Sequence, residues 1–251
     1  MSGHSHWATI KRKKGAADAK RGKTFSKLAR NITVAAKTGG GDLKLNLRLQ
    51  YAIEKAKAAN MPKDNIERAI KKGAGGSSGE ELFECLYEGY GPGGVAVMLE
   101  IVTGNKNRTA SEIRKIFDMY GGSLGVSGSV SWMFEKRGMV VVNSENVDED
   151  KLMMTALEAG AEDVVRVEHV YQVICAPSDF ESIRTTLTEQ DIPFESAEIS
   201  WVPKSLIELD EKAGKKVVKF MDALEDHDDV QDVYANFNLP KELLLEMQEE
   251  R

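Results

Sequence analysis

The apolar residues between positions 24 and 36 recur every three or four positions, which is the spacing of one face of an α-helix. The residues on this face are Phe25, Leu28, Ala29, Ile32 and Ala36. The residues on the opposite face are the cations Lys23, Lys27, Arg30 and Lys37. Val34 is the exception, because the pattern places it on the basic side. We therefore expect an amphipathic helix that ends at the glycine run 38–41.

Two further helices are expected before residue 73. Residues 43–49 alternate between apolar and polar types, but the Ala, Glu and Lys residues of 51–59 favour a helix that includes both segments. Its inward face is predicted to contain Leu45, Leu49, Ala52 and Ala56. Pro62 begins a short third helix, which ends at Gly73. Residues 73–80 are rich in Gly and Ser and predict a flexible linker.

Beyond the linker, short strand patterns alternate with helix patterns. Strands are expected at 95–102, 126–135, 139–142, 164–168, 170–176, 194–202, 206–209 and 230–237. Helices are expected at 109–120, 148–159, 179–189 and 212–225. Thr109 and Glu112 have the spacing of a capping box, so we place the start of the first of these helices at Thr109.

The order of these elements predicts two related units. Residues 139–202 contain two consecutive strand-helix-strand sets, which is the ferredoxin-like order. The segments 95–135 and 206–237 each contain half of such a set, and we expect the halves to pair because a lone half leaves its strand edges uncovered. The predicted fold is α+β with three domains: a basic three-helix domain at 1–78, a split ferredoxin-like α/β domain at 79–136 and 204–251, and a second ferredoxin-like α/β domain inserted at 137–203.

Charge is distributed very unevenly along the 251 residues. Residues 1–72 contain 18 Lys and Arg against 5 Asp and Glu, a net charge of +13. Residues 73–251 contain 16 against 35, a net charge of −19. Such asymmetry is typical of a protein with an arm that faces nucleic acid or another anionic surface. The candidate nucleic-acid-binding residues are Lys11, Arg12, Lys13, Lys14, Lys20, Arg21, Lys23, Lys27, Arg30 and Lys37.

Two alternatives to this interpretation of the basic region remain. Lys and Arg also solvate ordinary exposed helices, and a basic amphipathic N-terminus is a feature of mitochondrial transit peptides. The Lys-rich composition and the direct continuation into a structural helix argue against a transit peptide. The opposite charges also suggest that the arm rests weakly against the acidic body and thereby competes with non-specific binding. Otherwise, the acidic surface confers only solubility.

Little in the sequence indicates catalysis, a metal or a cofactor. Cys85 and Cys175 match no metal or redox spacing, and a Ser-Gly-His terminus that could bind copper or nickel lies in a basic tail. The glycine-rich segment 89–94 lacks the Lys-Ser/Thr of a P-loop, and the acidic run 225–232 has no calcium-loop spacing and suggests a solvated turn. Lys106 and Arg108, just before a predicted helix, are candidate phosphate contacts. A nuclease or hydrolase built from distant carboxylates and His169 or His227 is the remote alternative.

Several segments of the chain resemble the YebC family. They are Gly-His-Ser-His-Trp at 3–7, the basic run 11–14, residues 18–23, Tyr-Glu-Gly-Tyr-Gly-Pro-Gly-Gly at 87–94, Asn-Arg-Thr at 107–109, Gly-Gly at 121–122, and the pairs 224–225 and 228–230. The resemblance covers almost the whole chain and implies three domains and a cytoplasmic factor that binds nucleic acid. The sequence departs from the family pattern at Asn31, Leu43, Leu47 and Gly104.

We therefore expect a non-enzymatic, nucleic-acid-binding regulator of gene expression. The resemblance implies a DNA-binding transcriptional regulator, whereas the lack of a helix rich in base-reading side chains favours structured RNA and a ribosome-associated translation factor. Phosphate contacts would serve either polymer. No apolar run approaches the roughly 20 residues of a membrane helix, so a membrane is not expected as a partner. No small-molecule substrate is evident from the sequence either.

Overall fold

The computed structural model describes residues 18–75, 81–167, 169–240, 242–244 and 246, with side chains from residue 22 onward. Three helices form the N-terminal domain: α2 (Asp18–Gly39), α3 (Leu47–Ala58) and α4 (Lys63–Ala74). They enclose an apolar core of Leu28, Ile32, Ala35, Ala36, Leu49, Ile53, Ala56, Met61, Ile66 and Ala69. The spacing of apolar residues therefore identified the inward face of each helix.

Close packing and a buried amide hold these helices together. Gly73 of α4 lies so near α2 that a Cβ atom there would overlap the carbonyl oxygen of Thr33. The Asn46 side chain caps α3 by accepting the Leu49 N–H at 3.0 Å, and it donates to the carbonyl oxygen of Ala35 at 2.8 Å. Asn46 thus connects the start of α3 to the end of α2.

The structure corrects two details of the predicted helices. The Leu45 side chain is 83% exposed, because α3 begins only at Leu47 and Leu45 lies in the preceding turn. Val34 is buried although the pattern placed it on the basic face of α2. The packing of α4 against α2 through Gly73, which lies beside Thr33 and Ala36, extends the buried surface of α2 beyond its apolar stripe.

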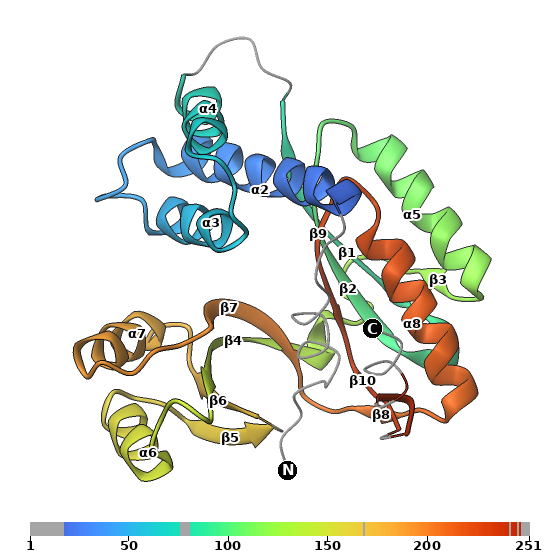
Figure 1. Cartoon of the computed structure of the whole chain (residues 1–251). Helices are drawn as coiled ribbons and strands as arrows, with labels where there is room; N and C mark the ends of the chain where they lie inside the picture. The colour runs from blue at the N-terminus through green and yellow to red at the C-terminus, as the bar shows by residue number, and fades with distance from the viewer. Residues whose placement is uncertain (1–17, 76–80, 168, 241, 245, 247–251) are drawn as a thin grey trace. The chain divides into compact units, whose positions relative to one another are not determined.

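A four-stranded antiparallel sheet forms the next domain. Its strands are β1 (Phe83–Tyr90), β2 (Ala96–Thr103), β3 (Ser123–Leu124) and β9 (Val230–Ala235), in the order β3-β1-β2-β9. The helices α5 (Lys106–Tyr120) and α8 (Glu211–Glu225) lie side by side against it (Figure 1). Both helices contribute to one core, in which the rings of Phe117 and Phe220 meet edge to face at 5.0 Å.

Several predicted strands of this domain differ from the structure. Strand β1 was missed, and the segment expected as a strand at 126–135 instead contains the 3₁₀ turn η2 (Ser131–Met133). The Glu88 carboxylate explains this turn, because it accepts N–H groups from Gly128, Val130 and Ser131 and holds the segment as a loop beside β1. The segment predicted at 206–209 forms β8 (Ile207–Glu208), which pairs with β10 (Phe237–Asn238) in a separate two-stranded sheet.

Residues 133–204 form a compact unit of their own. The unit contains β4 (Phe134–Asn143), α6 (Glu149–Glu158), β5 (Asp163–Val167), β6 (Val170–Cys175), α7 (Phe180–Glu189) and β7 (Ser196–Pro203). Its antiparallel sheet has the order β5-β6-β4-β7, which is the ferredoxin-like arrangement. The prediction of an α+β chain with a helical domain and two ferredoxin-like domains, one inserted in the other, is therefore confirmed.

Candidate nucleic-acid interface

The basic face of α2 presents three cations at intervals of four and three residues, which places them on one side of the helix. Lys23 is exposed, and Lys27 and Arg30 are half-buried. Lys37 is exposed in the last turn of α2. Lys11, Arg12, Lys13 and Lys14 lie outside the described residues, as do the side chains of Lys20 and Arg21.

The first three cations contact the turn between α8 and β9, about 200 residues away in the sequence. We call residues 225–229 the α8–β9 turn. Lys23 donates to the carbonyl oxygen of Asp226 at 3.2 Å, and Lys27 donates to that of Glu225. Arg30 donates to the carbonyl oxygen of Asp228 and to the carboxylate of Asp229, both at 2.7 Å. The basic face predicted from the sequence therefore exists, and part of it has an intramolecular partner.

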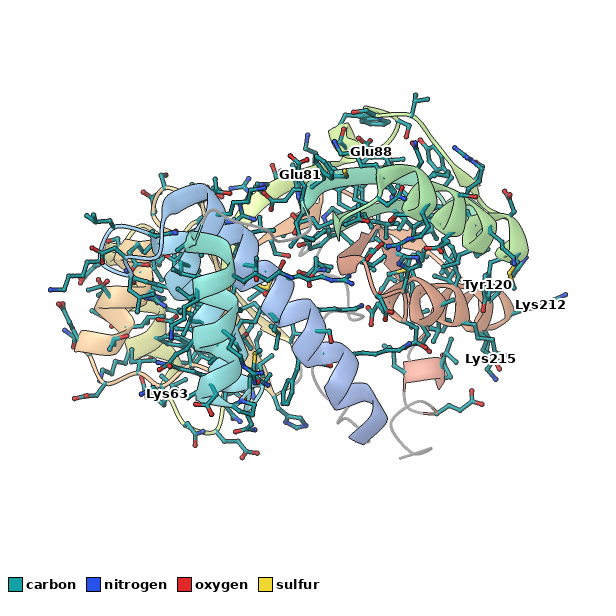
Figure 2. All side chains as sticks on the ribbon, turned by 90° about the horizontal axis from the view of Figure 1, so that it is seen from above. Lys63, Glu81, Glu88, Tyr120, Lys212 and Lys215 are labelled. Carbon is teal, nitrogen blue, oxygen red and sulfur yellow. The ribbon has the colours of Figure 1, made fainter. Side chains whose placement is uncertain are left out.

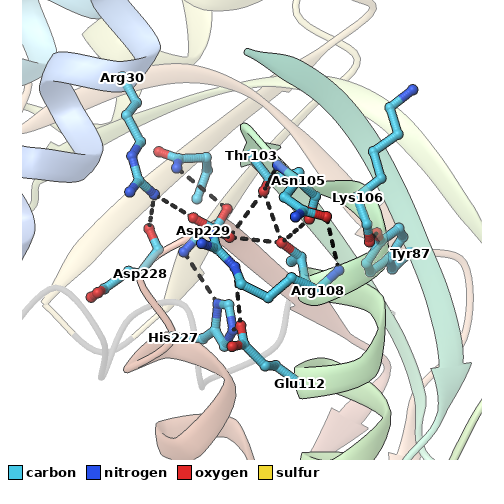
Figure 3. A network of polar contacts seen from close by, with 12 residues as sticks. Arg30, Tyr87, Thr103, Asn105, Lys106, Arg108, Glu112, His227, Asp228 and Asp229 are labelled. Carbon is cyan, nitrogen blue, oxygen red and sulfur yellow. Dashed lines mark hydrogen bonds and ion pairs between the residues drawn. The ribbon is translucent and has the colours of Figure 1, made fainter. Parts of the chain in front are cut away.

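Asp229 is the centre of this polar network (Figure 3). Its side chain is only 3% exposed, and its carboxylate accepts hydrogen bonds from Thr109 at 2.7 Å, Arg108 at 2.8 Å and Thr103 at 3.0 Å. Burial raises the pKa of Asp229, but these hydrogen bonds and the charge of Arg30 outweigh burial and hold the pKa below its usual value. The prediction of a solvated acidic turn is wrong for this residue.

The start of α5 is built around the same carboxylate. Asn105 caps the helix by accepting the Arg108 N–H at 3.1 Å, so α5 begins at Lys106 and not at the predicted capping box. Thr109 is instead fully buried inside the first turns, where its hydroxyl group lies 2.8 Å from that of Thr103. The Asp229 carboxylate therefore lies against side chains of the first turn of α5.

The two candidate phosphate contacts lie in this first turn of α5. Arg108 pairs with Asp229, and its side chain is 53% exposed. The Lys106 ammonium group lies 4.5 Å from the centre of the Phe83 ring, and the Lys106 carbonyl oxygen accepts the Tyr87 hydroxyl group. Arg108 therefore binds the carboxylate of Asp229, and Lys106 packs against the ring of Phe83.

His227 connects the α8–β9 turn to α5. Its Nδ1 accepts the Asp229 N–H at 3.2 Å, which leaves the ring proton on Nε2, and Nε2 lies 3.0 Å from the Glu112 carboxylate. Within the described ranges, no group of three His, Cys, Asp or Glu side chains is placed to hold a metal ion. Burial raises the pKa of the Cys175 thiol to about 11, which keeps it protonated and unreactive at neutral pH.

Two further links join the helical domain to the sheet. Lys55 of α3 pairs with Asp232 of β9 at 3.3 Å, and Arg48 pairs with Glu84 of β1. Lys71 and Lys72, which are not among the candidate nucleic-acid-binding residues, are exposed in the last turn of α4. Because α4 packs on α2 at Gly73, these two cations lie on the same domain as Lys37.

Cations also lie on the outer face of the split domain. Lys212 and Lys215 extend from the start of α8 (Figure 2). Lys215 binds Glu211 and Glu246, both within 3.0 Å, whereas Lys212, Lys216 and Lys219 are exposed along one side of the helix. In the part of the chain that is described, no helix is long and apolar enough to cross a membrane.

Comparison with known proteins gives matches along nearly the whole chain. Residues 5–76 match the family model described as the TACO1/YebC protein N-terminal domain, and residues 82–237 match the model for the TACO1/YebC second and third domain. A probable transcriptional regulatory protein of Halothermothrix orenii is 56% identical over the full length of both chains. One from Geobacter sulfurreducens is 56% identical over 96% of this chain and 98% of its own.

A solved structure has the same fold. The crystal structure of a conserved hypothetical protein from Aquifex aeolicus superposes with a TM-score of 0.86 at 50% sequence identity. The match covers 96% of this chain and 99% of the Aquifex chain.

Proposed function

Because the chain belongs to the TACO1/YebC family, we propose that it is a non-enzymatic regulator of gene expression that binds nucleic acid through its basic N-terminal region. The observation that carries the proposal is the separation of charge, +13 in residues 1–72 and −19 in the rest. Relatives named as probable transcriptional regulatory proteins support a regulator. The proposal takes DNA as its first target. The proposal places the protein in the cytoplasm.

The second candidate is a translation factor that binds structured RNA, and the surface of the helical domain favours it. Side chains that could read base edges on α3 and α4 contact protein groups instead: Arg68 donates to Asn65, Arg48 pairs with Glu84, and Gln50 donates to the carbonyl oxygen of Leu43. Among the side chains described in this domain, the other exposed cations are lysines, which bind phosphates without regard to sequence. Proteins recognise double-stranded RNA mostly by its shape and by contacts to its phosphates and 2′-hydroxyl groups.

The proposal predicts that the N-terminal region, and not the acidic body, carries the affinity. Replacement of Lys11, Arg12, Lys13 and Lys14 by Ala should weaken binding to every sequence by a similar factor, because counterion release depends on phosphate contacts alone. If each side chain meets a phosphate of duplex DNA, the slope of log K against log salt should fall by roughly 3 to 4, at about 0.9 per contact. Fluorescence anisotropy with labelled duplex DNA and an RNA hairpin of equal charge measures both quantities.

The matched control removes four cations from the body. Lys115 of α5 and Lys212, Lys216 and Lys219 of α8 are all exposed, so their replacement by Ala removes the same charge from the split domain. This variant should bind nearly as well as the unchanged protein. A larger loss from the control than from the N-terminal variant would contradict the proposal, and the polymer that binds more tightly at moderate salt decides between DNA and RNA.

A further inference from the structure

In the contact between α2 and the α8–β9 turn, the turn offers the α2 cations negatively charged acceptors, as phosphate groups would. The carbonyl oxygens of Glu225 and Asp226 belong to the last residue of α8 and its C-cap, where the final carbonyl groups have no partner inside the helix and carry the negative end of its dipole. The Asp229 carboxylate adds a full negative charge beside them. The α2 cations therefore contact carbonyl and carboxylate oxygens, which carry negative charge and only accept hydrogen bonds.

The turn does not depend on α2 for its shape. Asp229 is fixed from the other side by Thr103, Thr109 and Arg108, and its own N–H is bound by His227. The acceptors are therefore held in position by the split domain itself. A helix that leaves this surface would leave a formed site behind, so undocking requires no unfolding.

The strength of the contact suits reversible docking. The apolar cores of the helical domain and of the split domain are separate clusters. The bonds that Lys23 and Arg30 make to the carbonyl oxygens of Asp226 and Asp228 are exposed, and such contacts are individually weak and sensitive to salt. The bonds from Lys27 to Glu225 and from Arg30 to Asp229 are partly buried. A strand of nucleic acid offers denser charge to the same side chains.

We propose that the α8–β9 turn binds the basic face of α2 in the free protein as an internal substitute for phosphate groups, and that nucleic acid competes with the turn for this face. The inference rests on the proposed function and adds its regulation: sequences or structures that offer few closely spaced phosphates fail to displace the turn. Bound nucleic acid then holds the helical domain away from the turn. The apparent affinity for nucleic acid is the affinity of the undocked protein multiplied by the fraction of molecules that are undocked.

A cleavable cross-link tests the competition directly. Lys23→Cys and Asp226→Cys place thiols on the two sides of the contact, and a short disulfide-containing bismaleimide joins them. Cys85→Ser removes the half-buried native thiol, and Cys175 is buried. In anisotropy titrations with labelled duplex DNA and an RNA hairpin, the cross-linked protein should bind at least about tenfold more weakly than the same protein after reduction of the linker.

The other outcomes of the cross-linking experiment distinguish failure of the competition from failure of the proposed function. Equal affinity before and after reduction would overturn the competition and leave the proposed function intact. Failure of the linker to join the two cysteines would show that α2 and the turn do not meet in solution, which also overturns the inference. No binding by the reduced protein or by the unchanged chain would refute the proposed function itself.

A charge variant gives an independent measure in the full chain. Asp226→Asn with Asp228→Asn removes two exposed charges from the turn, and Glu81→Gln with Asp118→Asn removes two exposed charges elsewhere in the split domain. The turn variant should bind about three- to tenfold more tightly at low salt, with the difference closing as salt rises. The control variant should change affinity less than about twofold. Equal gains in both variants would show a general charge effect and would contradict competition at the turn.

Discussion

Replacement of Asp229 by Asn should destabilise the split domain, because the change keeps the shape of the side chain and removes its charge. The carboxylate accepts two hydrogen bonds from threonine hydroxyl groups and two from arginines, at 2.7 to 3.0 Å. The hydroxyl groups can rotate to suit an amide, so their bonds can persist. Arg30 and Arg108 donate to different oxygens of the carboxylate, and an amide keeps only one of these acceptors, so one arginine bond is lost and the other loses its charge assistance.

The magnitude follows from these two bonds. A hydrogen bond to a charged group contributes about 1.5 to 3 kcal/mol and a neutral one about 0.5 to 1.5 kcal/mol, so the lost arginine bond should cost about 2 kcal/mol and the weakened one about 1 kcal/mol. The free energy of unfolding should therefore fall by about 3 kcal/mol. For a chain of this size, the midpoint of thermal unfolding should fall by about 6 to 12 °C.

Calorimetric scans at several pH values test this prediction. The folded-state pKa of Asp229 lies below the unfolded value of about 4, so its charge contributes stability above that value, and the contribution is lost as the pH falls through the folded pKa. The difference between Asp229→Asn and the unchanged protein should be complete at neutral pH and should shrink below about pH 4. Asp228→Asn, at an exposed position, is the control. A difference of the same size at neutral pH and at pH 3 would refute the role of the charge.

Three other predictions concern Glu88, Gly73 and the two cysteines. Glu88→Gln should lower the free energy of unfolding by about 1 to 2 kcal/mol, because three N–H groups lose a charged acceptor, and limited proteolysis should then cleave faster at 125–131; unchanged cleavage would contradict this. Gly73→Ala should cost about 1 to 3 kcal/mol by forcing α4 from α2, as measured by helical circular dichroism, whereas Gly22→Ala, with open space around it, should not. Iodoacetamide should label Cys85 well before Cys175, whose pKa burial raises to about 11; equal rates in the folded protein would exclude protection by burial.

The sequence alone determined the elements with strong periodicity. The inward face of α2 followed from Leu28 and Ile32, because a spacing of three and four places residues on one side of a helix whatever surrounds it. The ferredoxin-like order of residues 133–204 followed from the alternation of strand and helix patterns. The unequal charge of the two parts of the chain is likewise a property of composition, and it predicted that the N-terminal region is basic.

Contacts between distant segments were decided only by the tertiary structure. Strand β1 carries Glu88 among its apolar residues, and its place in the sheet comes from its pairing with the distant strands β2 and β3. Leu45 has the type of a core residue, yet it lies in a turn because Asn46 caps α3. Asp229 looks like its exposed neighbour Asp228, and it is buried because Thr103, Thr109 and two arginines from other segments supply its hydrogen bonds. A local sequence pattern indicates whether a residue type favours the core or the surface. Burial of a charge depends on hydrogen-bond partners that only the fold brings within reach.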